Sequence, residues 1–355
     1  MATTATSNPV FRFFRSNARG FLIVFFLAAA LSLVTNTFLT GVNLASLGKQ
    51  VSIYAVLAIG ELVVIITGGI DLGVGSVVGL TSIVVAQVVM SHTTAGGIWL
   101  GILISLLAGV LCGLITGALV AYLKLPPFIA SLGMMQAARG VALLLCHGVS
   151  IGPVPGGFQN ISGASTFSVP NLVWFTLIVV VIVAVALSKT TWGRYVYAAG
   201  SNAESARLSG VPVRAVLVSA YAVSGLLAAF AGILLASRLN GGYPNNGTGY
   251  ELQAIAACVI GGASLFGARG TPVGALIGAL IVGMLNNGGS LLGVDPFWLQ
   301  VAIGVVIVAA VAVDQAPNWM PHIRGHSSKG GGGALDQPDA EPAVAAGEAV
   351  EVSTT

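Results

Sequence analysis

The stretch Trp192–Arg214, WGRYVYAAGSNAESARLSGVPVR, is a polar island with apolar segments on both sides. Ser201 and Glu204 have the spacing of a capping box, Gly210 suits a C-terminal cap, and Pro212 blocks continuation. This pattern predicts a helix of about eight residues, roughly 12 Å long. The chain as a whole is only 7% charged, yet the island concentrates Arg194, Glu204, Arg207 and Arg214.

The predicted short helix has two interpretations. A helix of this length is marginal in water on its own. Its small face would allow close docking against another surface, and that face comprises Ala203, Ala206, Ser209 and Gly210. The helix is either a docking site for a partner protein or part of an ordinary cytoplasmic loop.

The composition on either side of the island is that of a membrane protein. The chain is 56% hydrophobic, and its 7% charged residues compare with about 25% in ordinary soluble domains. Its 48 glycines fit closely packed membrane helices. A net charge of +3 is too small to suggest nucleic-acid binding. We therefore expect an all-α polytopic protein whose main surroundings are the lipid bilayer.

The apolar segments predict about ten membrane crossings, because a crossing helix needs about 20 mainly apolar residues. One of them, Leu252–Leu265, is short, and we expect it to be tilted, broken or re-entrant. The predicted spans are Phe21–Phe38, Val51–Thr67, Ser76–Met90, Ile98–Tyr122, Phe128–Cys146, Asn171–Ser188, Ala215–Ala236, Leu252–Leu265, Pro272–Asn287 and Phe297–Val313.

The basic residues predict that the island is cytoplasmic. With the N-terminus inside, six crossings return the island to the inside, and four more bring Arg324 and Lys329 there. Both termini are then cytoplasmic. Of the 14 basic residues, only Lys49 and Arg238 fall outside, while Arg139 falls within a span.

These spans divide the chain into three parts. We expect a cytoplasmic N-terminal segment at 1–20, a transmembrane domain at 21–315 with the island at 192–214, and a disordered cytoplasmic tail at 316–355, which is rich in small and acidic residues. The basic start and first apolar run also resemble a secretory signal. Because the run reaches spanning length, we expect it to be retained as a helix.

The segment Gly68–Gly75, GGIDLGVG, interrupts a long apolar run and has two interpretations. It is either a broken helix beside a translocation path, or a glycine turn between two helices with Asp71 as a cytoplasmic cap. A related patch, Gly261–Gly267, also follows a glutamate in an apolar run. The two glutamates are Glu61 and Glu251, and the pattern hints at an internal repeat.

Charged and polar side chains within the predicted spans are candidates for a path. A charge at the bilayer centre costs about 2.5–3.5 kcal/mol on insertion scales, so Glu61 and Arg139 should face the protein interior. They either face each other or make separate hydrogen bonds between helices. Neutral residues either line a path for a hydroxyl-rich solute or hold helices together: Gln136, Gln253, Asn286 and Asn287.

The sequence lacks the motifs of a self-contained pump or enzyme. It has no GxxxxGK[ST] phosphate loop, no convincing nucleophile–base set and no metal-ligand cluster. We therefore expect no catalytic residues, no metal and no cofactor bound by this chain. If it moves a solute uphill, the energy must come from a partner or from an ion gradient.

Several long stretches, in order, resemble the membrane permease subunit of bacterial ABC importers for sugars, specifically the ribose-type family. The similarity spans roughly 21–315. The stretches are Gly68–Ser76 (GGIDLGVGS), Leu125–Gly133 (LPPFIASLG), Gly193–Gly210 (GRYVYAAGSNAESARLSG), Gly249–Gly274 (GYELQAIAACVIGGASLFGARGTPVG) and Gly283–Gly293 (GMLNNGGSLLG).

The resemblance implies a multi-pass protein of the bacterial inner membrane that works as a homodimer. Two ATPase subunits, which bind ATP–Mg, would dock on its cytoplasmic face, and a periplasmic sugar-binding protein would deliver the solute. It also implies that the island contains the coupling helix, a role that maps onto Gly193, Arg194, Gly200, Asn202, Glu204, Ala206, Arg207 and Gly210. Two features depart from the family: Ala268 stands where a glycine is frequent, and the tail is long.

Two further classes of function stay open at this stage. A stand-alone secondary sugar transporter or facilitator would need its own coupling site, for which only Glu61, Asp71 and Arg139 are candidates. A structural or receptor subunit would be expected to carry a sizeable soluble domain. Among sugars, a pentose such as ribose is the best single expectation, since specificity in such importers lies largely in the binding protein.

Overall fold

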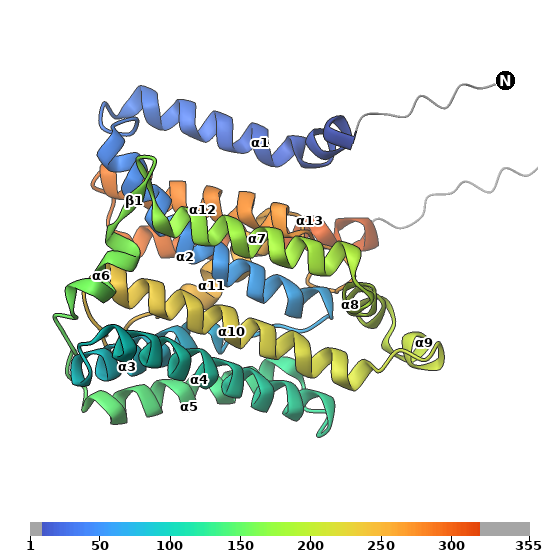
Figure 1. Cartoon of the computed structure of the whole chain (residues 1–355). Helices are drawn as coiled ribbons and strands as arrows, with labels where there is room; N and C mark the ends of the chain where they lie inside the picture. Colours follow the sequence, from blue (N-terminus) through green and yellow to red (C-terminus); the bar gives the residue numbers. More distant parts are fainter. Residues whose placement is uncertain (1–8, 320–355) are drawn as a thin grey trace, which may run out of the picture. The chain divides into compact units, whose positions relative to one another are not determined.

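The computed structural model describes residues 9–319, and in this range the chain is almost entirely helical (Figure 1). Its contacts separate a unit at Met1–Pro317 from a second unit at Asn318–Thr355. The predicted disorder of the tail concerns residues that mostly lie outside the described range. The helices are α1 (Pro9–Val34), α2 (Gly41–Ile66), α3 (Val74–Ser91), α4 (Ala95–Ala121), α5 (Pro127–Cys146), α6 (Gly156–Gly163), α7 (Asn171–Lys189), α8 (Thr191–Ser201), α9 (Ala203–Leu208), α10 (Val213–Leu239), α11 (Tyr250–Ile260), α12 (Pro272–Leu291) and α13 (Pro296–Trp319).

Seven of the described helices are long and apolar enough to cross a membrane, namely α2, α3, α4, α5, α7, α10 and α12. The predicted first span falls on a shorter apolar stretch, Gly20–Val34, within α1. The predicted span Leu252–Leu265 is shortened to α11, whose 11 residues extend only about 16 Å. The helical membrane fold is thus confirmed, whereas the number ten and the side of the termini stay predictions.

The core of the unit is built around α2. Its second half, from Val51 to Ile66, is apolar except for a few residues, and 89% of the most hydrophobic 18-residue stretch of α2 is buried, mainly by α7, α10, α11 and α12. By contrast, only 22% of the corresponding 18-residue stretch is buried in α4 and in α5, and only 28% in α7. A helix that is hydrophobic all round but exposed suits contact with lipid tails. α4 and α7 therefore present a surface suited to lipid, whereas α5 also exposes the polar side chain of Gln136.

The closest helix pair, α4 and α10, meets along a seam of small residues. A Cβ atom built on Gly109 would overlap the Gly225 carbonyl oxygen, and one built on Gly113 would overlap the Tyr221 carbonyl oxygen. Gly117 continues the seam one turn further on. The four-residue spacing places these glycines on one face, so the two backbones are in direct contact.

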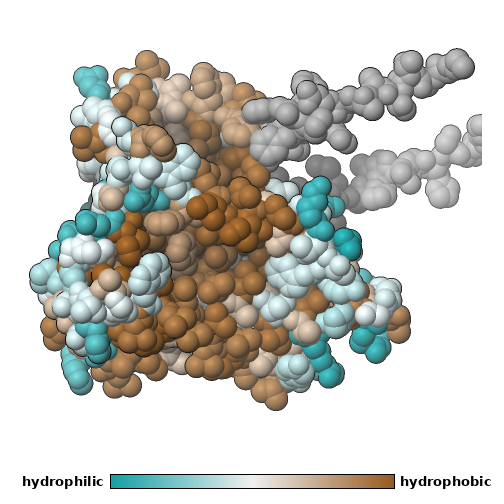
Figure 2. Space-filling view, viewed as in Figure 1, coloured by the Kyte–Doolittle hydropathy of each residue, from teal (hydrophilic) through white to brown (hydrophobic). Residues whose placement is uncertain are grey.

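Hydrophilic residues gather at two opposite ends, with a hydrophobic band between them (Figure 2). At one end, which we call the α8–α9 end, the ends of α2, α4, α8 and α10 meet around a cavity of about 140 Å³. At the other end, α6 is fastened to α10 because the Ser162 hydroxyl donates to the Leu234 carbonyl and the Ser162 amide donates to the Ser237 hydroxyl oxygen. A two-stranded antiparallel hairpin lies beside α7: β1 (Ser165–Thr166) and β2 (Val169–Pro170).

Candidate functional site: the α8–α9 end and the buried polar groups

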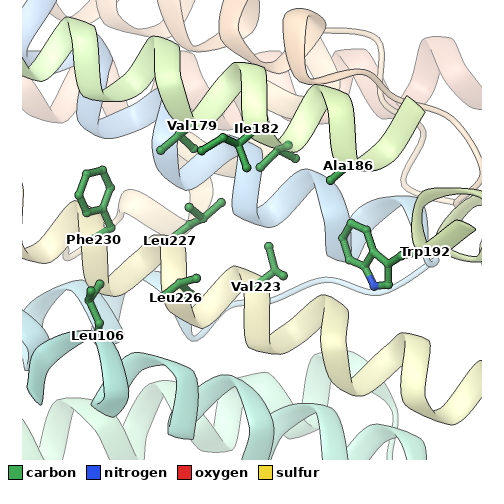
Figure 3. Close-up of a pocket in the computed structure, with 10 residues that line it drawn as sticks. Leu106, Val179, Ile182, Ala186, Trp192, Val223, Leu226, Leu227 and Phe230 are labelled. Atoms are coloured by element: carbon green, nitrogen blue, oxygen red, sulfur yellow. The ribbon is translucent and has the colours of Figure 1, made fainter. Parts of the chain in front are cut away.

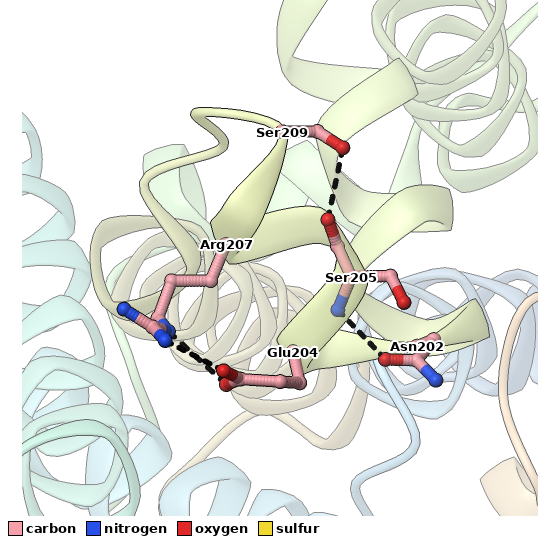
Figure 4. Close-up of polar contacts among 5 residues, drawn as sticks. All are labelled: Asn202, Glu204, Ser205, Arg207 and Ser209. Atoms are coloured by element: carbon pink, nitrogen blue, oxygen red, sulfur yellow. Dashed lines mark hydrogen bonds and ion pairs between the residues drawn. The ribbon is translucent and has the colours of Figure 1, made fainter.

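The polar island folds as two helices, α8 and α9, instead of one. The predicted capping box is wrong, because Ser201 is the last residue of α8. The N-cap of α9 is Asn202, whose side-chain oxygen accepts a hydrogen bond from the Ser205 amide at 2.8 Å (Figure 4). Asn202 also closes α8, since its own amide bonds to the Ala198 carbonyl. One extended residue therefore separates two helices that the sequence pattern merged.

The C-terminal end of α9 agrees with the prediction. Gly210 has a φ of +84°, the left-handed conformation that glycine adopts without strain. Its amide bonds to the Arg207 carbonyl, and the Val211 amide bonds to the Ala206 carbonyl. This pair of bonds is the Schellman ending. After Pro212 the chain continues directly into α10.

The outer surface of α9 is exposed and carries both charge and an apolar tip. Arg207 forms an ion pair with Glu204, its Nε lying 3.1 Å from the carboxylate. This hydrogen bond and the positive charge hold the pKa of Glu204 below its usual value. Next to the pair, Leu208 is 75% exposed, while Ala206 is buried against the body of the protein. A large apolar side chain kept in water at a projecting tip suggests a contact surface.

The underside of α8 rests on the ends of two other elements. A Cβ atom built on Gly200 would lie only 1.7 Å from the Ile66 carbonyl oxygen at the end of α2. The same oxygen accepts a hydrogen bond from the Ala268 amide, in the α11–α12 connection, at 2.9 Å. The Tyr197 hydroxyl donates to the Gly270 carbonyl at 2.7 Å, and burial raises its pKa. α8 is therefore in direct contact with the end of α2 and with the α11–α12 connection.

The segment between α2 and α3 buries an acidic pair in the protein interior. Glu61, which is fully buried in α2, accepts a hydrogen bond from the Asp71 amide at 3.0 Å. The Asp71 carboxylate accepts from the Gly73 amide and from the Ser224 hydroxyl, both at 2.9 Å. The segment is a turn between two helices, and Asp71 accepts the Gly73 amide immediately before α3, as a cap would. Only 5% of Asp71 is exposed, and that it faces the cytoplasm stays a prediction.

The hypothesis that Glu61 and Arg139 face each other is also wrong. The Arg139 guanidinium on α5 instead donates to the carbonyl oxygens of Pro244 and Asn246, at 2.8 and 2.9 Å. Both oxygens belong to the irregular segment between α10 and α11. The Asn246 side chain is fixed in turn by the Ser82 hydroxyl of α3, at 3.2 Å. Arg139 thus holds an irregular segment against α3 and α5. The polar backbone groups of this segment are thereby satisfied within the protein.

A polar and aromatic cluster around the start of α11 was missed by the sequence reasoning, except for Gln253. The rings of Tyr54 and Tyr250 meet edge to face with centroids 5.2 Å apart. Gln50 donates to the Tyr54 hydroxyl at 3.1 Å, and the buried side-chain oxygen of Gln253 has no hydrogen-bond partner among the described residues. Arg238, at the end of α10, lies within electrostatic reach of both tyrosines. One of the two basic residues that broke the inside rule therefore belongs to this cluster.

The other predicted path residues do not join either group. Asn287 and Asn43 exchange two amide hydrogen bonds, at 2.8 and 3.1 Å, and so connect α12 to α2. Asn286 donates to the Val282 carbonyl of its own helix. Gln136 is exposed on the outer surface of α5. The Asn43–Asn287 pair fits the interpretation of polar side chains that hold helices together, whereas the hydrogen bond of Asn286 stays within α12.

The comparisons with known proteins identify the family. The family model described as "Branched-chain amino acid transport system / permease component" matches residues 43–311, which is most of the chain. The chain belongs to this permease family.

Curated relatives cover most of this permease. It is 42% identical over 300 residues to the ribose import permease protein RbsC of Bacillus subtilis (strain 168), covering 83% of this chain and 91% of the relative. It is 41% identical to RbsC of Escherichia coli (strain K12), covering 81% and 90%. It is 38% identical to the L-arabinose transport system permease protein AraH of the same organism, covering 83% and 90%. No solved structure matches.

The family and the apolar helices together identify this permease as a multi-pass protein of the inner membrane. In ABC systems of this kind the permease is the membrane subunit, and the ATPase lies in a partner subunit. Among the described residues, no three His, Cys, Asp or Glu side chains group as metal ligands.

Proposed function

We propose that this permease is the membrane subunit of an ATP-driven importer that moves a monosaccharide, ribose or a similar pentose, from the periplasm to the cytoplasm. The choice of sugar rests on the relatives, which are named for ribose import and L-arabinose transport. The observation that supports the ATP-driven mechanism is the projecting helix α9, which has an exposed tip. The neighbouring helix α8 contacts the end of α2 and the α11–α12 connection.

In this proposal α9 is the coupling helix, and an ATPase subunit receives it in a groove. Leu208 would enter that groove, flanked by the Glu204–Arg207 pair, while Asn202 and Gly210 fix the two ends of the helix. Closure of the ATPase pair would push α9, and the Gly200 contact would pass the push to α2. ATP–Mg binds the ATPase subunit, and this chain binds no cofactor.

A second copy of the chain would complete the transporter. The exposed surface of α5 carries Gln136 between Gly133 and Gly140, and the space next to each glycine is open. A polar amide on a membrane-facing surface is costly in contact with lipid tails. A homodimer in which α5 faces the path, or the partner's copy of α5, removes this cost. The binding protein would dock at the end opposite α9. With the predicted ten crossings and both termini in the cytoplasm, α9 would lie on the cytoplasmic side.

The cluster around Tyr54 and Tyr250 is the proposed contact point for the sugar within each chain. Hydroxyl-rich solutes are recognised by amide, guanidinium and hydroxyl groups beside apolar ring surfaces. The free oxygen of Gln253 offers an acceptor, and Arg238 offers donors. Glu61 and Asp71 lie nearer the α8–α9 end, and with Arg139 they shape the turn and the irregular segment beside the path.

One observation favours a second function, that of a stand-alone secondary sugar transporter. The buried Glu61–Asp71 pair is a potential proton site, because a second oxygen of Glu61 has no hydrogen-bond partner among the described residues. Transport by the purified chain alone in vesicles, driven by a proton gradient and abolished in Glu61→Gln, would support this alternative. A requirement for ATP and the ATPase subunit would exclude it.

The coupling role is tested by co-purification with the ATPase subunit of the proposed importer. Leu208→Glu and Arg207→Glu should reduce the retained ATPase at least tenfold. Leu123→Glu is the matched control, since Leu123 is 65% exposed and follows α4 at the same end. Gly210→Trp should act like Leu208→Glu because it distorts the end of α9. Equal retention in all variants would contradict the role of α9.

A further inference from the structure

An apolar groove runs along the lipid-facing surface between α7 and α10 and does not belong to the sites described above. It has a volume of about 360 Å³, and only apolar carbon surfaces are open in its walls (Figure 3). Val179, Ile182 and Ala186 line it from α7, Val223 and Leu227 from α10, and Leu106 from α4. Ile182 is 61% exposed, so the groove is open to the surrounding membrane.

The groove ends at the α8–α9 end in a polar and basic rim. Trp192, the second residue of α8, closes the groove, and its indole nitrogen donates to the Ser219 hydroxyl at 2.8 Å. On α7, the spacing of Ile182, Ala186 and Lys189 places all three on one face of the helix. The apolar stripe of the groove therefore finishes at a lysine, which is exposed.

A second basic group lies next to this rim. Arg194 is exposed, and its guanidinium folds back to the Thr191 hydroxyl, beside Trp192, at 3.2 Å. No ion pair joins Lys189 or Arg194 to an acidic side chain among the described residues. An apolar groove at membrane depth that ends in unpaired positive charge and an interfacial tryptophan complements one kind of molecule. That molecule has an apolar chain and an anionic head at the interface.

We propose that this groove binds the acyl chain of an anionic phospholipid, whose phosphate is held by Lys189 and Arg194. The lipid would wedge between α7 and α10 and touch the start of α8. Since α8 carries α9 and rests on α2, the bound lipid would stabilise the seat of α8. The groove needs no sugar and no ATPase to be occupied, so the proposal is independent of the proposed function.

The proposal is tested by native mass spectrometry of the purified full chain with phosphatidylglycerol, and with phosphatidylcholine as the neutral comparison. The wild type should retain phosphatidylglycerol preferentially. The double variant Lys189→Gln, Arg194→Gln should bind it roughly thirtyfold more weakly, taking about 1 kcal/mol for each basic side chain near the surface. Lys124→Gln, which removes an exposed charge from the α4–α5 turn at the same end, is the matched control and should bind as the wild type does.

The apolar half of the site is tested separately. Ala186→Phe should fill the groove and reduce retention of phosphatidylglycerol, while glycerophosphoglycerol, which has no acyl chains, should not compete in the wild type. A thermal melt of each variant shows whether it is folded. If Ala186→Phe is not folded, the double variant Lys189→Gln, Arg194→Gln still tests the proposal. Equal retention of both lipids, or unchanged retention in the double variant, would overturn the proposal. So would a crosslink between Ile182→Cys side chains of two copies, because a second copy would then cover the groove.

Discussion

Replacement of Gly200 by alanine tests most directly how the polar island is attached to the membrane helices. The added Cβ would lie 1.7 Å from the Ile66 carbonyl oxygen and 3.0 Å from the Ala268 nitrogen. Because neighbouring atoms are backbone atoms, no side chain can rotate away to make room. The end of α8 must therefore separate from the end of α2 by more than an ångström, which also stretches the Ala268–Ile66 hydrogen bond.

Overpacking of this kind costs about 1–3 kcal/mol. The matched control is Gly140→Ala in α5, where nothing lies within 4 Å of the added atom. There the change should stabilise the helix by about 0.5–1 kcal/mol, because alanine loses less backbone freedom than glycine on folding. The two substitutions are chemically identical, so the difference in sign comes from the surroundings alone.

The assay is a thermal melt of each purified variant in the same detergent. At roughly 2–4 °C for each kcal/mol, Gly200→Ala should melt several degrees below the wild type, and Gly140→Ala at or above it. In the assembled importer, Gly200→Ala should also transport less sugar for each ATP hydrolysed. A melting temperature of Gly200→Ala equal to that of Gly140→Ala would refute the close contact between α8 and α2.

Three further predictions concern the buried polar groups and α5. Asp71→Ala removes the acceptor of two buried hydrogen bonds and should cost about 2–4 kcal/mol; Asp71→Asn keeps one acceptor oxygen and should melt higher than Asp71→Ala, and identical melts would count against this network. Asn43→Ala and Asn287→Ala should each cost about 1–2 kcal/mol, while the double variant should cost clearly less than the two together, because no amide is then left unpaired; additive losses would show that the pair is not formed. Gln136→Leu should change the free energy of unfolding by no more than about 0.5 kcal/mol yet lower sugar transport; unchanged transport would remove Gln136 from the path.

The sequence was sufficient for the features that depend on composition and on local chain geometry. Long apolar segments predicted the membrane helices, and the island appeared where the charge is concentrated. Gly210 was recognised as a helix end because its left-handed conformation is a local requirement. Asn202 was not recognised as the cap, because Ser201 competes for the same role and only the fold of α8 decides between them.

The partners of buried groups could not be predicted, because they depend on which helices meet. Arg139 binds carbonyl oxygens of a segment more than a hundred residues away, and backbone oxygens leave no mark in a sequence. Tyr54 and Tyr250 are ordinary apolar-helix residues until α2 and α11 pack together. One signal was available: the predicted topology put Arg238 on the outer side, which is unusual for a basic residue and indicated a role other than topology.

The glycine seam between α4 and α10 limits how the transporter can change shape. Helices that interlock through long side chains can slide, because those side chains can adopt new rotamers in a new register. Along Gly109 and Gly113 there are no side chains to rearrange, and the two main chains rest directly on each other. Helices α4 and α10 should therefore move together as one rigid body. Any alternation between the two faces of the membrane must then change the contacts at its borders, where α2 and α3 pack against it, so those two junctions are the places to look for hinges.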